Sequence, residues 1–310
     1  MKTLRQAVTD YLSLRRSLGF KLTKHESCLR ELVYFLKKKG AARISTALAL
    51  QFATQHRHQQ PAEWAARLSI VRGFARYRSG DDHSTEIPPL GLLPYRAKRA
   101  RPYLYSEKEI CQLLKAARNL PPTYELKPWT YYSLFGLLVV TGMRVSEVLN
   151  LQQNDVDWAQ GVLTVRGTKF GKSRLVPLHA STKTALLAYA KRRDHFFAEH
   201  PVSHFFVSSW GNRLDGAGVR RTFYLLSRQI GLRDASASHG PRLHDLRHRF
   251  AVETLVRWYR NNEDVERRLP ILSTYLGHAH VTDTYWYLTS TPELLGAAGK
   301  RMEKRWAGLL

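Results

Sequence analysis

The spacing of apolar residues predicts that the chain begins with a helical region. Apolar side chains recur every three to four positions over residues 4–36, 45–56 and 61–78, with basic side chains between them. Pro61 stands where a proline is well tolerated, in the first turn of a helix. We therefore expect residues 1–85 to form a compact helical domain.

The helical pattern then lapses. Residues 86–103 are rich in proline and carry no apolar periodicity, which is typical of an interdomain linker. The same stretch carries a run of basic side chains, namely Arg96, Lys98, Arg99 and Arg101.

Residues 104–310 are predicted to form a second, larger domain in which helices dominate. It opens with Ser106 followed by Glu109, the spacing of a helix N-cap and its acidic partner. Two short β-type runs, 161–165 and 174–178, flank a basic stretch and indicate a hairpin with a long tip. The expected fold class is mainly α with a small β-sheet or hairpin in the second domain.

Composition adds a partner to this picture. The 310 residues include 49 Lys and Arg against 25 Asp and Glu, a formal net charge of +24, while 44% are hydrophobic, as in a globular protein. Both predicted domains are basic, because residues 1–100 hold 19 basic and 7 acidic side chains and the remainder holds 30 and 18. Such a surplus of positive charge favours a polyanion as the binding partner, either nucleic acid or an anionic membrane surface.

The apolar segments argue against a membrane. The longest strongly apolar run, 134–140, is far shorter than the roughly 20 residues that span a bilayer. Charges at Asp10, Arg15 and Arg16 interrupt the N-terminal segment before a signal-peptide core develops. We expect a cytoplasmic protein that is associated with the nucleoid when bound to DNA.

Two cysteines, Cys28 and Cys111, lie far apart in different predicted domains. This spacing gives neither a disulfide framework nor a metal knuckle, so both are expected to be buried, reduced thiols.

The predicted hairpin tip, residues 167–173, superficially resembles a phosphate-binding loop. It is one residue short of that motif and is followed by a strand rather than a helix, so an NTPase is rejected. Contact with a nucleic-acid backbone is the better interpretation, and Lys172 and Arg174 join the linker residues as candidate DNA contacts.

Two groups of polar side chains share helical faces. Arg144 and Glu147 are three positions apart, and Glu147 is expected to orient the site, although an ordinary surface ion pair is the alternative. His244, Arg247 and His248 also share a face. Histidines spaced this way can bind zinc, but the nearby arginine opposes a cation and no acidic ligand stands out, so no metal site is expected.

A third group lies near the C-terminal end, where a predicted helix ends at Gly277 and His278 follows. Taken singly, His278 is a plausible helix cap, and Tyr285 and Tyr287 are plausible core residues. Residues two apart on a helix point in different directions, so at most one of the tyrosines faces the site. The spacing alone leaves Tyr285 and Tyr287 as rivals for that position.

Taken in order, these residues resemble the signature of the tyrosine recombinase family, the phage integrases and Xer-type recombinases. That signature is Arg, Lys, His-x-x-Arg, His or Trp, and Tyr, and the resemblance covers most of the chain. Motif by motif, it falls on Arg144, Lys169, His244, Arg247, His278 and Tyr287. It implies a core-binding, SAM-like domain at 1–85 and a lambda-integrase-type catalytic domain at 104–310, which form a two-domain, C-shaped DNA clamp.

The residue types also suit phosphodiester chemistry. Attack places negative charge on the nonbridging oxygens, which the guanidinium forks of Arg144 and Arg247 can bind. A phenol is a weak nucleophile because its pKa lies near 10, so Tyr287 needs a base, for which His244 is the candidate. Lys169 can protonate the leaving 5′ oxygen, and His278 can hydrogen-bond a phosphate oxygen.

This scheme needs neither a metal nor any other cofactor, because the phosphotyrosine ester conserves the energy of the phosphodiester. The sequence shows no carboxylate cluster for paired magnesium ions, which counts against a two-metal nuclease or transposase.

The resemblance implies site-specific recombination or integration of DNA through a covalent 3′-phosphotyrosine and a Holliday junction, as in mobile elements. The expected partners are double-stranded DNA, other protomers in a tetramer on two DNA sites, and accessory recombination proteins. A type IB topoisomerase and a catalytically inactive DNA-binding protein are the alternatives. The C-terminal tail, residues 291–310, is expected to pack on a neighbouring protomer or on its own domain, and both arrangements stay open.

Overall fold

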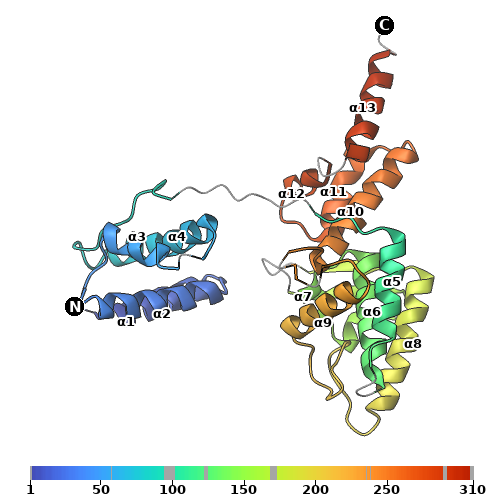
Figure 1. Cartoon of the computed structure of the whole chain (residues 1–310), viewed down its shortest axis with the longest axis horizontal. Coiled ribbons are helices and arrows are strands. Elements are labelled where there is room, and N and C mark those ends of the chain that lie inside the picture. The colour runs from blue at the N-terminus through green and yellow to red at the C-terminus, as the bar shows by residue number, and fades with distance from the viewer. Residues whose placement is uncertain are drawn as a thin grey trace. The chain divides into compact units, whose positions relative to one another are not determined.

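The chain is described by a computed structural model that covers residues 2–56, 58–93, 102–121, 125–167, 173–234, 236–237, 239–288 and 292–307. The chain divides into two compact units, residues 1–100 and 101–310 (Figure 1). The described residues are mostly helical with a small antiparallel sheet, which confirms the predicted fold class.

Helices form the first unit, and their bounds match the apolar periodicity closely. They are α1 (Leu4–Ser17), α2 (Thr23–Lys38), α3 (Thr46–Thr54) and α4 (Pro61–Arg78). Helix α1 begins with a capping box between Thr3 and Gln6, and its apolar face enters the core of the unit. There the ring of Tyr11 contacts Phe74 and Tyr77 of α4.

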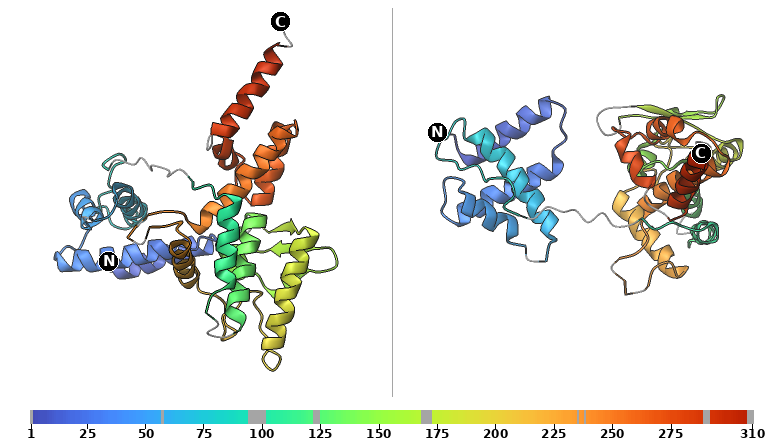
Figure 2. Two further views of the ribbon diagram at one scale, coloured as in Figure 1. Left: turned by 45° about the vertical axis from the view of Figure 1, so that its right-hand side comes forward. Right: turned by 90° about the horizontal axis from the view of Figure 1, so that it is seen from above.

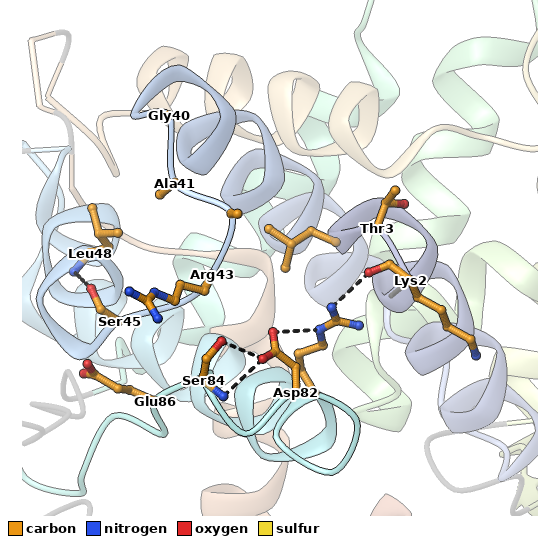
Figure 3. A pocket seen from close by; sticks show the side chains of 13 residues that line it. Lys2, Thr3, Gly40, Ala41, Arg43, Ser45, Leu48, Asp82, Ser84 and Glu86 are labelled. Atoms are coloured by element: carbon orange, nitrogen blue, oxygen red, sulfur yellow. Dashed lines mark hydrogen bonds and ion pairs between the residues drawn. The ribbon is translucent and has the colours of Figure 1, made fainter.

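A cavity of about 980 Å³ lies in this unit between the start of α1, the segment before α3 and the turn after α4 (Figure 3). Its polar wall is internally paired: Arg78 donates to the carbonyl of Lys2 at 2.9 Å and lies 3.6 Å from the Asp82 carboxylate. Glu86 accepts a bond from the backbone nitrogen of Thr46 at 2.7 Å and so caps α3. These bonds fasten the chain after α4 to the first unit.

The beginning of the predicted linker takes part in the same attachment. Arg72 of α4 donates to the carbonyls of Pro88 and Pro89 at 2.7 and 2.9 Å. Four of the candidate DNA-contact residues of the linker, Arg96, Lys98, Arg99 and Arg101, lie outside the described residues.

The second unit contains the remaining elements. They are α5 (Glu107–Arg118), α6 (Leu126–Thr141), α7 (Val145–Asn150), η1 (Gln153–Asp155), β1 (Val156–Asp157), β2 (Val162–Val165), β3 (Arg174–Pro177), α8 (Ala180–Phe196), α9 (Gly216–Gln229), α10 (Leu243–Arg260), α11 (Val265–Leu276), α12 (Thr282–Leu288) and α13 (Pro292–Ala307). Helix α5 begins at the predicted capping box, in which Ser106 and Glu109 bond each other's backbone nitrogens.

Helices α5, α6 and α8 lie side by side in the main core of this unit (Figure 2). The sheet has the order β1-β2-β3, and its β2–β3 pair is the predicted hairpin. Leu163 and Val176 face each other across this pair and are fully buried, which fixes the hairpin against the core. Residues 168–172 of the hairpin, with Lys169 and Lys172, lie outside the described part of the chain.

A second core joins α10, α11, α12 and the first turn of α13. Leu294 at the start of α13 is buried there, whereas its neighbour Leu295 is 54% exposed. The rest of α13 extends away from the body of the unit (Figure 1). Helix α10 contacts both α6 and α12, so it connects the two cores of the unit.

One sequence expectation is wrong in this unit. Cys28 is buried as predicted, but Cys111 is exposed. Helix α5 buries Ile110, Leu113 and Ala117, and position 111 falls on the opposite, solvent-facing side of the same helix. Within the described ranges, no helix has both the length and the apolar composition to cross a membrane.

Candidate active site

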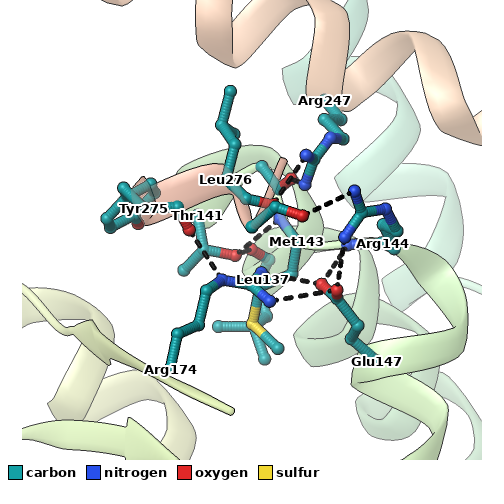
Figure 4. Close-up of polar contacts among 11 residues, drawn as sticks. Leu137, Thr141, Met143, Arg144, Glu147, Arg174, Arg247, Tyr275 and Leu276 are labelled. Carbon is teal, nitrogen blue, oxygen red and sulfur yellow. Dashed lines mark hydrogen bonds and ion pairs between the residues drawn. The ribbon is translucent and has the colours of Figure 1, made fainter. Parts of the chain in front are cut away.

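Arg144 enters the site at a sharp turn between two helices. Helix α6 ends at Gly142, where φ is +60°, and a Cβ at that position would lie 2.6 Å from Cδ1 of Phe250, so the close approach requires glycine. The turn makes Arg144 the N-cap residue of α7. Its guanidinium donates to Oε1 of Glu147 at 2.8 Å and to the carbonyl of Gly277 at 3.0 Å (Figure 4). The pairing predicted from their three-residue spacing is therefore present.

Glu147 is shared by two arginines. Arg174, on β3, donates from Nη1 and Nη2 to the two carboxylate oxygens of Glu147 at 3.0 and 2.8 Å. Its Nε donates to the carbonyl of Tyr275 at 2.7 Å. The side chains of Arg174 and Glu147 are only 9% and 6% exposed. Burial alone would raise the pKa of Glu147, but the bonds from Arg174 and Arg144 outweigh burial and lower it.

This geometry corrects the sequence interpretation of Arg174. The sequence placed it among the DNA-backbone contacts at the hairpin, but its guanidinium points inward and is committed to Glu147 and Tyr275. Because β3 is short and lies beside the end of α11, the side chain reaches the site from the strand rather than leaving it for solvent. Arg174 is a positioning residue that joins the sheet to both α7 and α11.

Arg247 supplies a second guanidinium from α10. It is 2% exposed and donates to the carbonyls of Gly142 at 2.9 Å and Leu276 at 2.7 Å. Burial, reinforced by the positive charge of Arg144, lowers the pKa of Arg247 to about 10, so the guanidinium stays charged at neutral pH. The bonds from Arg144 and Arg247 to successive carbonyls at the end of α11 bring the two guanidiniums to the same loop (Figure 4).

His278 follows directly after that loop. Helix α11 ends at Gly277 with φ of +68°, and a Cβ there would lie 2.9 Å from Nη1 of Arg174. Nδ1 of His278 forms a hydrogen bond of 2.8 Å with Oγ1 of Thr284, which orients the imidazole. Burial, together with the charges of Arg247 and Arg144, lowers the pKa of His278 to about 4, so its ring is neutral at neutral pH.

The two tyrosines of α12 occupy different environments. Tyr287 is 3% exposed, whereas Tyr285 is 49% exposed. The Tyr287 ring is stacked on His278 with centroids 6.0 Å apart and also contacts His248 at 5.5 Å. The negative charge of its phenolate form would raise the pKa of the Arg247 guanidinium. Of the two tyrosines, only Tyr287 is buried, in contact with His248 of α10 and with His278 after α11.

The histidines of α10 complete the neighbourhood. Part of the His244 side chain is exposed to solvent. Neighbouring atoms exclude water from the rest of the ring, and this desolvation lowers the pKa of His244; the positive charge of Arg247 lowers it further. His248 is buried, and its ring contacts those of His244 at 4.7 Å and Tyr287 at 5.5 Å. Burial lowers the pKa of His248 to about 4, so it is neutral beside the phenol.

The structure thus gathers five of the six predicted catalytic positions around the ends of α6 and α11. They are Arg144, His244, Arg247, His278 and Tyr287. The sixth, Lys169, lies outside the described residues. Sequence reasoning missed the positions of His248 and Thr284 in this site. The four-residue spacing of His248 from His244 was a signal for it, whereas a lone threonine gives none.

Three guanidiniums around one carboxylate leave the cluster with excess positive charge. Glu147 neutralises part of the charge of Arg144, Arg174 and Arg247, and neutral imidazoles add none. Such a cluster suits a singly charged oxyanion such as a phosphodiester. In the described part of the chain, no group of three or more His, Cys, Asp or Glu side chains has the arrangement of a metal site.

Replacing Arg174 tests its structural role. We expect Arg174→Gln to lower the free energy of unfolding by about 3 kcal/mol, because it leaves the buried Glu147 carboxylate without its bidentate partner. Urea titration followed by tryptophan fluorescence measures this, since every tryptophan but Trp64 lies in the second unit. Arg268→Gln, which breaks the more exposed pair with Glu263, should cost under about 1 kcal/mol. Equal losses in the two variants would contradict the role assigned to Arg174.

The Glu147 carboxylate should also make stability depend on pH. Its pKa is lowered in the folded protein, so the stabilisation is present above the ordinary carboxyl range and is lost as pH falls through the folded pKa. The difference in free energy of unfolding between wild type and Glu147→Gln should therefore shrink as pH falls below the ordinary carboxyl range. Urea titrations across this range measure the difference. A difference that stays constant would show that the charge of Glu147 does not stabilise the fold.

Known proteins resemble this chain in sequence and in fold. Residues 104–293 match the model of the phage integrase family. The chain is 57% identical over 310 residues to "Putative integrase/recombinase y4rB" of Sinorhizobium fredii, covering 99% of both proteins. It is 25% identical over 308 residues to tyrosine recombinase XerA of Thermococcus onnurineus, covering 97% and 96%. Its fold matches a lambda integrase tetramer bound to a Holliday junction with a TM-score of 0.62 and 19% identity, covering 91% of this chain and 79% of that one.

Proposed function

The chain belongs to the phage integrase family and is a site-specific tyrosine recombinase, and on that premise we propose that Tyr287 cleaves duplex DNA by forming a 3′-phosphotyrosine ester. The observation that carries the proposal is the buried Tyr287 ring, which is stacked on His278 directly after the two carbonyls that hold Arg144 and Arg247. The comparisons favour a recombinase over the topoisomerase and the inactive DNA-binding protein.

The first step is transesterification. The phenolic oxygen of Tyr287 bonds to phosphorus as the bond from phosphorus to the 5′ oxygen breaks, and the phosphate stays diester. Arg144 and Arg247 bind the nonbridging oxygens, where charge grows in the transition state. His278 donates a hydrogen bond to one of these oxygens, and Thr284 holds its ring for this.

Two proton transfers accompany the step. His244 accepts the phenolic proton, and Lys169 protonates the leaving 5′ oxygen. His248 contacts both His244 and Tyr287, which fits a role in aligning the proton path between them. Attack by a 5′ hydroxyl of a second duplex reverses the chemistry and joins the strands to a new partner. The scheme uses neither a metal nor a nucleotide.

We place the reaction in an assembly of four protomers on two DNA sites that passes through a Holliday junction. The resemblance of fold to a lambda integrase tetramer on such a junction supports this. The basic first unit would act as a core-binding domain, joined to the catalytic unit by the basic linker, so that both units grip one duplex. The exposed part of α13 is available to pack on a neighbouring protomer.

A suicide substrate tests the proposed reaction. The protein is incubated with a nicked duplex that carries its recombination site, in the presence of EDTA, and the products are separated under denaturing conditions. We expect a protein–DNA adduct that resists denaturation, because the short fragment that carries the freed 5′ hydroxyl diffuses away after cleavage and cannot reverse the reaction. A site that is bound without forming any adduct would contradict the proposal.

The pH dependence of cleavage tests the role of His244. Its pKa lies below the ordinary value of 6.5, so the free base persists to lower pH than in an unperturbed histidine. At subsaturating DNA, the rate of adduct formation should fall only below pH 6.5 as pH decreases. His244→Gln should react more slowly, and its rate should lack that acidic decline. If the decline persists unchanged in this variant, another group is the base.

A further inference from the structure

An unusual basic group lies at the far end of the second unit. The indole of Trp129 has the guanidinium carbon of Arg118 at 3.2 Å and that of Arg192 at 3.8 Å from its ring centroid. Two planar guanidiniums at these heights are too bulky to share one face of the ring, so they cover opposite faces. We refer to Arg118, Trp129 and Arg192 as the arginine–tryptophan sandwich.

Three helices contribute one residue each to the sandwich. Arg118 is in the last turn of α5, Trp129 is in the first turn of α6, and Arg192 is near the end of α8. These helices lie side by side (Figures 1 and 2). The edge of Trp129 packs against the core and against Tyr132, so the ring is a fixed support. The sandwich is therefore rigid, although Arg192 itself is exposed.

The two guanidiniums have unused hydrogen-bonding capacity. Among the described residues, neither forms an ion pair or a hydrogen bond, in contrast to Arg144, Arg174 and Arg247. Stacking on an aromatic face uses the plane of a guanidinium and leaves its N–H edge free for an acceptor. The neighbouring Lys115 and Lys191 are exposed and add to the positive charge.

The sandwich is separate from the catalytic cluster. Trp129 and Thr141 lie at opposite ends of α6, about 18 Å apart at 1.5 Å per residue. The proposed mechanism assigns no role to this end of the unit. The hydrocarbon parts of the two arginine side chains would be enough to cover the indole, so covering the ring does not explain why two guanidiniums lie on it without counterions.

We propose that the arginine–tryptophan sandwich binds the phosphodiester backbone of duplex DNA, at a position distinct from the phosphate that is cleaved. The inference rests on the proposed function, because it takes DNA as the partner. Two cations on a rigid ring match successive phosphates of a polyanion, and their stacking reduces the side-chain entropy lost on binding. The site gives affinity without reading sequence.

The salt dependence of binding tests this inference. The double variant Arg118→Gln with Arg192→Gln is titrated against a long fluorescent duplex of mixed sequence at several salt concentrations. Loss of two phosphate contacts should reduce the slope of log K against log salt by about 1.8. The charge-preserving pair Arg118→Lys with Arg192→Lys should keep the wild-type slope. Trp129→Leu should also keep the slope but bind more weakly, because the arginines lose their support.

The outcomes separate this inference from the proposed function. Adduct formation by the wild-type protein on the suicide duplex reports the proposed chemistry independently of the salt slope. An unchanged salt slope would overturn the inference, even if the adduct still forms. A reduced slope in a protein that forms no adduct would leave the DNA contact standing while the proposed chemistry fails.

Discussion

Tyr287→Phe should abolish the covalent protein–DNA adduct while leaving DNA binding intact. The substitution removes a single oxygen, so the ring contacts with His278 and His248 are retained. Removal of an enzyme's nucleophile lowers the rate by on the order of 10⁴-fold or more. Denaturing electrophoresis of a labelled suicide duplex measures the adduct, and a mobility-shift titration measures binding.

Tyr285→Phe is the matched control, because it removes the same atom from the same helix. Tyr285 is 49% exposed and should leave adduct formation within about twofold of wild type. If Tyr287→Phe still forms the adduct and Tyr285→Phe does not, the nucleophile has been assigned to the wrong tyrosine. The difference in burial between the two rings is the structural basis for the choice.

Arg247→Lys should lower the rate of cleavage by about 10²- to 10³-fold, the loss expected for a group that stabilises an oxyanion. A lysine keeps the charge but loses the fork that bonds the carbonyls of Gly142 and Leu276 and presents its remaining N–H groups to phosphate. Single-turnover rates at saturating DNA measure the effect on chemistry. DNA affinity should change by less than about tenfold, because most phosphate contacts lie elsewhere.

Arg249→Lys provides the control on the same helix. Arg249 is partly buried and donates from Nε to the carbonyl of Tyr105 at 2.7 Å, away from the arginine cluster. Its replacement should leave cleavage near the wild-type rate. Equal slowing in the two variants would mean that Arg247→Lys acts through the packing of α10 rather than through the phosphate.

Local sequence signals predicted much of the fold because they reflect local physics. Ser106 with Glu109 marked the start of α5, Gly277 marked the end of α11, and the β-type runs gave the β2–β3 hairpin. Each signal concerns residues that are neighbours along the chain, where backbone bonding and side-chain spacing decide the structure. The predicted domain boundaries at 85 and 103 stay a prediction.

Contacts between distant segments were harder to predict. Arg174 and Glu147 are 27 positions apart, and nothing in the basic hairpin indicates that one of its arginines turns inward. The error was to treat all basic residues near the hairpin as equivalent, although strand alternation gives neighbouring side chains opposite faces. The prediction for Cys111 failed for a similar reason. Cysteines are usually buried, but Cys111 lies on the solvent-facing side of α5 and is exposed.

The residue types of the candidate catalytic residues and their order along the chain could be predicted from the sequence, but their geometry could not. Spacing placed Arg144 beside Glu147, and the resemblance to the family signature favoured Tyr287 over Tyr285. The carbonyls that hold Arg144 and Arg247 belong to the ends of other helices. Such backbone acceptors carry no sequence signature, because every residue supplies the same carbonyl. Their positions follow only from the packing of α6, α10 and α11.

The sharing of Glu147 between Arg144 and Arg174 has an evolutionary consequence. A substitution at Glu147 leaves both arginines without their shared partner, and a substitution at either arginine removes hydrogen bonds from the carboxylate. The effect of each substitution therefore depends on which residues occupy the other two positions. Mutational paths through this triplet are therefore epistatic, and intermediates with one changed member should be rare among functional descendants. The three residues should be inherited as a block while the surrounding surface diverges.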